Sequence, residues 1–390
     1  MPGNYNIQKI VFVFIFLSTW FIQNAVSQSE YINRFIKVYQ SSRNQYFIKS
    51  LSGNSYDFMV ISTALDALQS IYTTTKDSAY LNDEKKIIDN IISSSGASFA
   101  LPGNINKIKD DYLGWISKTR HQAYNNEAQL FESYVFQYIV KFLYQLKRSG
   151  WVSLSPEHAQ WYNNTLFFTE KHIWRKWIDR STRQSGLPYR IFLGIRTHMA
   201  AHWAGIALVL EQLTQNEEIK NQCRELYTEY DTLLKRNLKP NPVHPDAYTW
   251  NCTWDNIDKT QARKDSRTII QDVSHGNHVI SYIITAQEMG NSNWSIENIN
   301  KFINTVKLVV YDSQNHIFSD GVDGSPSLTR PGWGNFQADG WVKLGRFDKD
   351  LQYLYINYSK KRKNLLLKYS QSLQYYANLA LNEYYIQSLN

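Results

Sequence analysis

The sequence has few of the features that would indicate a disulfide-stabilised, membrane-spanning or repeat protein. Only two of its 390 residues are cysteines, Cys223 and Cys252, so at most one disulfide could form, and their spacing does not show that they meet. After residue 27 no apolar run is long enough to cross a bilayer. Apolar–polar alternation with a period of two is scarce, and there is neither a βαβ rhythm nor a fixed repeat length. These absences disfavour β-rich, α/β and regular solenoid folds.

The first residues predict an exported protein. A polar start, "MPGNYNIQK", precedes the apolar run "IVFVFIFLSTWFI", and "AVS" at 25–27 offers small residues for cleavage. This run is too short to span a bilayer comfortably, so it predicts a secretory signal peptide over residues 1–27, with an uncleaved anchor as the alternative. We expect a single secreted catalytic domain over residues 28–390, monomeric and not attached to a membrane.

Composition narrows the classes of partner. The chain is 43% hydrophobic and 19% charged, which allows a large core. Its 12 Trp and 27 Tyr exceed what a core alone needs, and such amphipathic rings suit stacking on sugars. The formal net charge of +8 favours an acidic polymer, or it serves solubility alone. Short basic runs such as 360–363 do not indicate nucleic acid, so we expect no such partner.

Apolar spacing of three and four residues predicts helices almost throughout. More apolar helices are expected at 56–72, 128–146, 199–213 and 278–289, and more polar ones at 82–94, 155–178, 216–236 and 295–313. Polar helices can face water, whereas uniformly apolar ones must be enclosed. Their alternation predicts an all-α fold, an α/α toroid, as an incomplete barrel of about six to seven helical hairpins. A stacked α-solenoid is the rival.

Polar clusters occur near the N-terminal ends of the predicted inner helices. They read "RHQAYNNE" (120–127), "RTHMAAHW" (196–203), "DVSHGNH" (272–278) and "RPGWGNFQADGW" (330–341). Because alternate helices of a toroid run the same way, these ends should meet. Helix N-termini carry partial positive charge, so the sequence predicts a site for an anionic ligand. Five histidines fall in these clusters: His121, His198, His202, His275 and His278.

Such residues suit β-elimination on a uronic-acid polymer. A neutraliser (Asn, His or Arg) must hydrogen-bond the substrate carboxylate so that the adjacent C–H becomes acidic. A Tyr or His must take that proton, and another must protonate the leaving oxygen. No carboxylate pair and no cofactor or metal is needed.

The motifs "AYNNE", "RTHMAAHW" and "SHGNHVISY" on successive inner helices resemble the α/α-toroid polysaccharide lyases that cleave alginate or glucuronan, with polysaccharide lyase family thirty-eight as the nearest likeness. The resemblance implies a lyase with Asn125 as neutraliser and His198 and His275 beside it. It leaves the catalytic tyrosine open between Tyr124 and Tyr248. Arg196 completes the expected catalytic set.

A second set of residues is expected to bind the acidic polysaccharide. Trp250, Trp254 and Trp333 could stack on sugar rings or belong to the core. The other members are polar side chains of the same clusters: His202, Asn277, His278, Asn335 and Asp339.

Two other functions remain open. A glycoside hydrolase on the same scaffold needs two carboxylates flanking the scissile bond. The candidates are Glu127, Asp246, Asp255, Asp272 and Asp339. A non-catalytic carbohydrate-binding protein is the third reading, although it would not need histidines at helix ends. "HMAAH" (198–202) has metal-ligand spacing but lacks the glutamate of a zinc protease.

Overall fold

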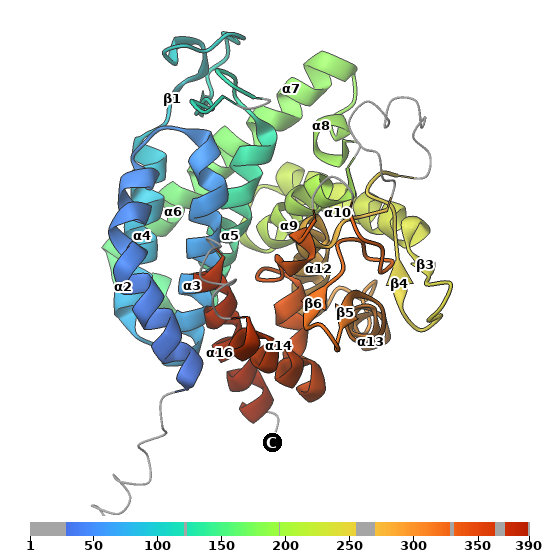
Figure 1. Ribbon diagram of the computed structural model, residues 1–390. Coiled ribbons are helices and arrows are strands. Elements are labelled where there is room, and N and C mark those ends of the chain that lie inside the picture. The colour runs from blue at the N-terminus through green and yellow to red at the C-terminus, as the bar shows by residue number, and fades with distance from the viewer. Residues whose placement is uncertain are drawn as a thin grey trace, which may run out of the picture.

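The computed structural model describes residues 29–120, 123–194, 196–254, 270–327, 331–362 and 371–388. The segment predicted as a signal peptide, 1–27, lies outside them, as do His121 and Asp255. Within the described residues the chain is predominantly helical, which confirms the all-α prediction (Figure 1).

Helices of two kinds alternate along the chain, as the sequence predicts. Helix α9 (Thr197–Leu213) is buried almost all round, because Ala, Ile, Leu, Val and Trp occupy every side of it. The next helix, α10 (Glu217–Asn237), instead buries one stripe that includes Cys223, Leu226 and Tyr230 and leaves its charged residues in water. Burial thus separates an inner helix from an outer one.

The inner elements form a closed ring. Consecutive members pack on one another in the order α16, α3, α5, α9, α12 and η7, and η7 packs back on α16. Their bounds are Phe58–Thr75 (α3), Gln129–Arg148 (α5), Thr197–Leu213 (α9), Val273–Glu288 (α12), Trp341–Arg346 (η7) and Ser372–Ser388 (α16). Helices from the two ends of the chain therefore lie side by side, blue against red in Figure 1. The predicted α/α toroid is confirmed, although a short 3-10 segment, η7, replaces one long inner helix.

The outer elements cover this ring from outside. They are α2 (Glu30–Ser50), α4 (Ser78–Ser93), α6 (Pro156–Phe168), the π-helical η4 (Thr169–Arg175), α7 (Lys176–Ser185), α10, α13 (Ile296–Asn304), the π-helical η5 (Thr305–Val310) and α14 (Lys349–Lys361). One continuous apolar core fills the space between the two layers.

Short elements occupy the connections between helices. The antiparallel strand pairs are β1 (Gly96–Ala97) with β2 (Leu113–Gly114), β3 (Lys239–Pro240) with β4 (Tyr248–Thr249), and β5 (Tyr311–Asp312) with β6 (Ile317–Phe318). The remaining turns are η1 (Ser55–Asp57), η2 (Ser98–Ala100), η3 (Trp151–Ser153), α8 (Arg190–Leu193) and η6 (Trp333–Asn335).

Helix α12 begins earlier than its apolar pattern predicts. The expected start was residue 278, but the helix begins at Val273, because the Asp272 carboxylate accepts the His275 backbone N–H and caps it. The polar cluster "DVSHGNH" thus lies in the first turns of the helix, with its side chains directed by helical geometry.

Two further properties follow from the described residues. No helix there combines the length and hydropathy needed to cross a membrane. Cys223 and Cys252 are both buried and are not bonded to each other.

Candidate functional site

Five aromatic rings from three inner helices meet near the N-terminal ends of those helices. The rings of His198 and His275 are tilted by 31° with centroids 4.3 Å apart, and those of His202 and His278 are tilted by 47° with centroids also 4.3 Å apart. The ring centroid of Tyr134, on α5, is 4.5 Å from that of His202 and 5.4 Å from that of His278. These five residues are called the histidine cluster below. The pairs form because His198 and His202 are one turn apart on α9, as His275 and His278 are on α12.

Each histidine of α12 is paired with an aspartate through Nδ1. His275 Nδ1 lies 2.8 Å and 2.9 Å from the two oxygens of Asp272. His278 Nδ1 lies 3.1 Å from Asp339 Oδ2. Because an ionised carboxylate only accepts, each imidazole donates its Nδ1–H, and Nε2 remains for other partners.

Asp339 belongs to a buried network that extends away from the cluster. Its Oδ1 accepts the Tyr138 hydroxyl at 2.6 Å and the Lys343 ammonium at 3.2 Å. Lys343 also donates to Asp66 at 2.7 Å. Both Asp339 oxygens therefore accept from fixed donors, and the carboxylate is only 4% exposed, so it does not face a substrate directly.

Burial and these contacts set the protonation states. Burial lowers the pKa of His198 and of His202 well below the usual histidine value, and the neighbouring histidines add to this. Burial opposes ionisation of Asp272, but hydrogen bonds and charge interaction with His275 lower its pKa below the usual range. Burial likewise opposes ionisation of Asp339, and Lys343 and His278 lower its pKa. At neutral pH two carboxylates are ionised and the α9 histidines are neutral.

Exposure falls from one pair to the other. The Asp272 and His275 side chains are 30% and 25% exposed, whereas Asp339 is 4% exposed. Trp333 of η6 is 37% exposed, and its ring centroid is 6.0 Å from that of His275. The solvent-facing side of the cluster is therefore formed by Asp272, His275 and Trp333.

Two ring nitrogens of the cluster have no hydrogen-bond partner. His202 Nδ1 is 2.6 Å from the Gln137 amide, but His202 Nε2 is buried without a partner, as is His198 Nδ1. Because the Gln137 amide donates to His202 Nδ1, the neutral His202 ring carries its proton on Nε2 and can donate it to a ligand or water. Buried polar atoms are normally satisfied, so His198 Nδ1 is also a position for such a partner. Nonetheless, no group of three or more His, Cys, Asp or Glu in the described residues is arranged to hold a metal ion.

Several expected site residues lie elsewhere. Trp250 and Trp254 are buried, the first against Trp341 and the second against Tyr230, so they belong to the core and cannot stack on a sugar. Tyr248 packs on Phe302 of the outer layer, and its hydroxyl accepts from Asn298. Tyr248 was predicted to reach the site because its segment reads as a loop. Instead strand β4 pairs with β3 and fixes it against α13.

The predicted neutraliser lies in the loop before α5. Asn125 adopts a left-handed backbone (φ 57°), and its main chain bonds to Ser117 and Ile105. Tyr124 beside it is 40% exposed. Arg196 donates to Cys252 Sγ at 2.9 Å. No hydrogen bond joins Asn125 to His198 or His275 in the part of the chain described, so its predicted role stays a prediction.

Two other predicted residues hold the fold together. Asn277 is buried; its amide N–H donates to the Phe336 carbonyl, and its Oδ1 accepts from Gly340 and Trp341. Asn335 accepts the Tyr358 hydroxyl at 2.8 Å. Both fasten the segment before η7, and neither is free to bind a substrate.

Of the carboxylates considered for a hydrolase that the structure describes, Asp272 and Asp339 join the cluster. Glu127 is buried with Lys176 and Arg180. Asp246 is exposed in the turn before β4, where its carbonyl accepts from Asn304.

The sequence interpretation missed Tyr134, Gln137 and Tyr138 of α5. They stand inside an apolar helix rather than at its end, so the search for polar clusters did not find them. Their spacing of three and four residues, which places them on one helical face, was the available signal.

Comparison with known proteins gives a distant likeness of architecture. No family model matches the chain, and no curated protein does either. Among solved structures it is similar to the GH76A alpha-1,6-mannanase of Salegentibacter sp. HEL1_6, with 11% identity over 91% of this chain and all of that chain, at a TM-score of 0.47. An inactive variant of that enzyme in complex with alpha-1,6-mannotetrose shows 12% identity over 93% of this chain and all of that chain, also at a TM-score of 0.47. At this level no residue role is transferred.

The prediction of an alginate or glucuronan lyase was wrong. The solved structures that match are glycoside hydrolases rather than polysaccharide lyases. The site gives a physical reason, because the predicted positive end contains two ionised aspartates. Negative charge there disfavours both a uronate substrate and the anionic intermediate of β-elimination.

Proposed function

We propose that this protein is a glycoside hydrolase that cleaves a polysaccharide at the solvent-facing side of the histidine cluster. The observation that carries the proposal is the pair of ionised aspartates, each bonded to a histidine of α12. Glycoside hydrolysis passes through an oxocarbenium-like transition state, which is positively charged. Fixed carboxylates stabilise such charge.

In this proposal His275 moves the proton. Asp272 holds its Nδ1–H and stabilises the doubly protonated ring, as the carboxylate does in an Asp–His pair. His275 Nε2–H then protonates the glycosidic oxygen while the bond from that oxygen to the sugar carbon breaks. Water adds to the oxocarbenium carbon and returns one proton to His275. One water molecule is consumed for each glycosidic bond cut.

Asp339 and His278 support the Asp272–His275 pair from deeper in the protein. Their network with Tyr138 and Lys343 is buried, so it contributes a fixed negative charge and positions the ring of His278. Trp333, exposed beside His275, offers a face for a sugar ring. The expectation that the chain is secreted, from the signal peptide predicted at 1–27, fits an enzyme that meets its polymer outside the cell.

The proposal is tested by incubating the purified protein with a panel of polysaccharides and measuring new reducing ends. The panel contains neutral polymers, alpha-1,6-mannan among them, and uronic-acid polymers. New reducing ends on at least one polymer, with no ultraviolet absorbance from unsaturated sugars, are expected. Binding without cleavage across the panel would instead indicate a carbohydrate-binding protein and overturn the hydrolase.

A further inference from the structure

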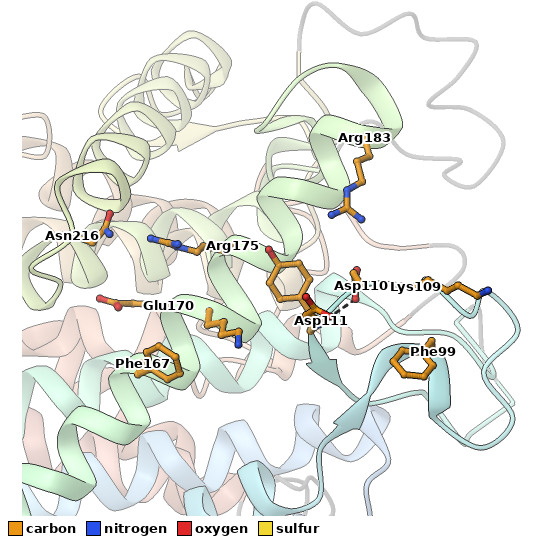
Figure 2. Close-up of a pocket in the computed structure, with 11 residues that line it drawn as sticks. Phe99, Lys109, Asp110, Asp111, Phe167, Glu170, Arg175, Arg183 and Asn216 are labelled. Atoms are coloured by element: carbon orange, nitrogen blue, oxygen red, sulfur yellow. Dashed lines mark hydrogen bonds between the residues drawn. The ribbon is translucent and has the colours of Figure 1, made fainter.

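A hollow of the molecule lies outside the inner ring. It is a cavity of about 880 Å³ over the outward side of α6, η4 and α7, and the segment after β1 forms one end of it (Figure 2). Its most prominent lining side chains are two phenylalanines and four basic residues: Phe99, Phe167, Lys109, Lys171, Arg175 and Arg183. We call it the outer groove. None of the five residues of the histidine cluster lines it.

The basic side chains that line the outer groove outnumber the acidic ones. None of its four basic side chains forms an ion pair with a described residue, and Lys109, Arg175 and Arg183 are exposed. The Asp110 carboxylate in its wall is already bonded to Arg180, at 3.0 Å and 3.2 Å. That leaves Asp111 and Glu170 as the acidic side chains facing four cations. The groove therefore favours an anion.

Apolar rings accompany these charges. Phe99 and Phe167 are 50% and 59% exposed, although burying such a ring would stabilise the fold. Lys171 lies over the Phe167 ring, 5.9 Å from its centroid. Figure 2 shows Phe99 and Lys109 at one end of the groove and Phe167, Glu170 and Arg175 toward the other. An elongated ligand could therefore contact rings and cations along its length.

We propose that the outer groove binds an acidic polysaccharide chain, with carboxylates on Lys171, Arg175 and the other cations and sugar faces on the two phenylalanines. Sugar rings stack on aromatic side chains, and cations pair with uronate groups. Asp111 and Glu170 accept hydrogen bonds from sugar hydroxyls, which a nucleic-acid backbone offers sparsely. This goes beyond the proposed hydrolase, because the groove binds its chain whether or not a bond is cut at the histidine cluster.

The test measures binding of a galacturonate oligomer by calorimetry to matched charge variants. The groove variant is Lys171→Gln with Arg175→Gln. The control is Arg236→Gln with Lys360→Gln, two exposed basic side chains without ion pairs among the described residues, on α10 and α14. Both variants remove two positive charges. Loss of two charge-assisted contacts should weaken binding at least about tenfold in the groove variant and less than about twofold in the control.

Three results would overturn the proposal. Equal weakening in both variants would mean that net charge alone attracts the oligomer. Loss of binding in His275→Ala would place the oligomer at the histidine cluster. Single-stranded DNA bound as tightly as the galacturonate oligomer, and lost in the same groove variant, would identify a nucleic-acid site. If a sugar ring stacks on Phe167, Phe167→Ala should weaken binding of the oligomer several-fold. Unchanged binding in that variant would contradict the proposed stacking.

Discussion

Two histidines one turn apart on α12 are each paired with an aspartate, and the two pairs differ in what surrounds them. Asp272–His275 faces solvent and has Trp333 beside it. In the Asp339–His278 pair the carboxylate is buried against Tyr138 and Lys343, and the imidazole is 16% exposed. The same two residue types can therefore serve chemistry or architecture, and exposure and spare hydrogen-bonding capacity decide which.

The largest expected effect comes from removing the exposed imidazole. His275→Ala should lower kcat by about 10²- to 10⁴-fold, because general acid–base catalysis contributes that much. The free energy of unfolding should change little, since the side chain is partly exposed. Reducing-end assays measure the first quantity and urea unfolding the second. His244→Ala, outside the cluster, is the control, and near-normal activity of His275→Ala would refute the site.

Substitution of Asp339, in the more buried pair, should lower stability more than substitution of Asp272 in the exposed pair. Asp339→Ala leaves Lys343 and His278 without their shared carboxylate in the interior, so unfolding free energy should fall by about 3–5 kcal/mol. Asp272→Asn keeps a good helix cap and should cost less than about 1 kcal/mol while reducing activity. Urea unfolding of the two variants compares them directly. Equal losses of stability would abolish the distinction between the pairs.

The free energy of unfolding should also depend on pH, because the buried histidines of α9 bind protons less readily in the folded chain than in the unfolded chain. Burial lowers the pKa of His202, so below about pH 6.5 the unfolded chain takes up a proton that the folded chain does not. Stability is therefore lost as pH falls, by about 1 kcal/mol between pH 6.5 and 5.5 for each such histidine. His202→Gln, which can still bond Gln137, should make the urea midpoint less pH-dependent than in the unmodified protein. An unchanged slope would show that His202 does not contribute.

The smallest effect is expected from Trp333, which lies beside the exposed Asp272–His275 pair. Trp333→Ala removes a stacking surface worth about 0.5–1.5 kcal/mol, so KM should rise roughly threefold to tenfold while kcat stays within about twofold. Steady-state kinetics on a cleaved polymer separate the two constants. A fall in kcat without a change in KM would mean that Trp333 positions His275 rather than the sugar.

The sequence predicted the scaffold better than the site. Periodicity distinguished inner helices such as α9 from outer ones such as α10. A helix buried on all sides has apolar residues all round, whereas a helix buried on one side has them in a single stripe. It also placed His198 and His275 at helix ends that meet. It could not show that Trp250 is core and Trp333 exposed, because both are tryptophans in polar segments and only packing separates them. The tertiary partners of Asp339, Tyr138 and Lys343, were equally invisible along the chain.

If water cuts a glycosidic bond at the Asp272–His275 pair, the products formed in heavy-oxygen water must contain oxygen from that water. Mass spectrometry measures this incorporation. We expect products that together weigh one water more than the substrate, with one heavy oxygen at each new reducing end and none at the new non-reducing end, and no such products from His275→Ala. Products with an unsaturated end and no incorporated oxygen would contradict cleavage by water at this pair.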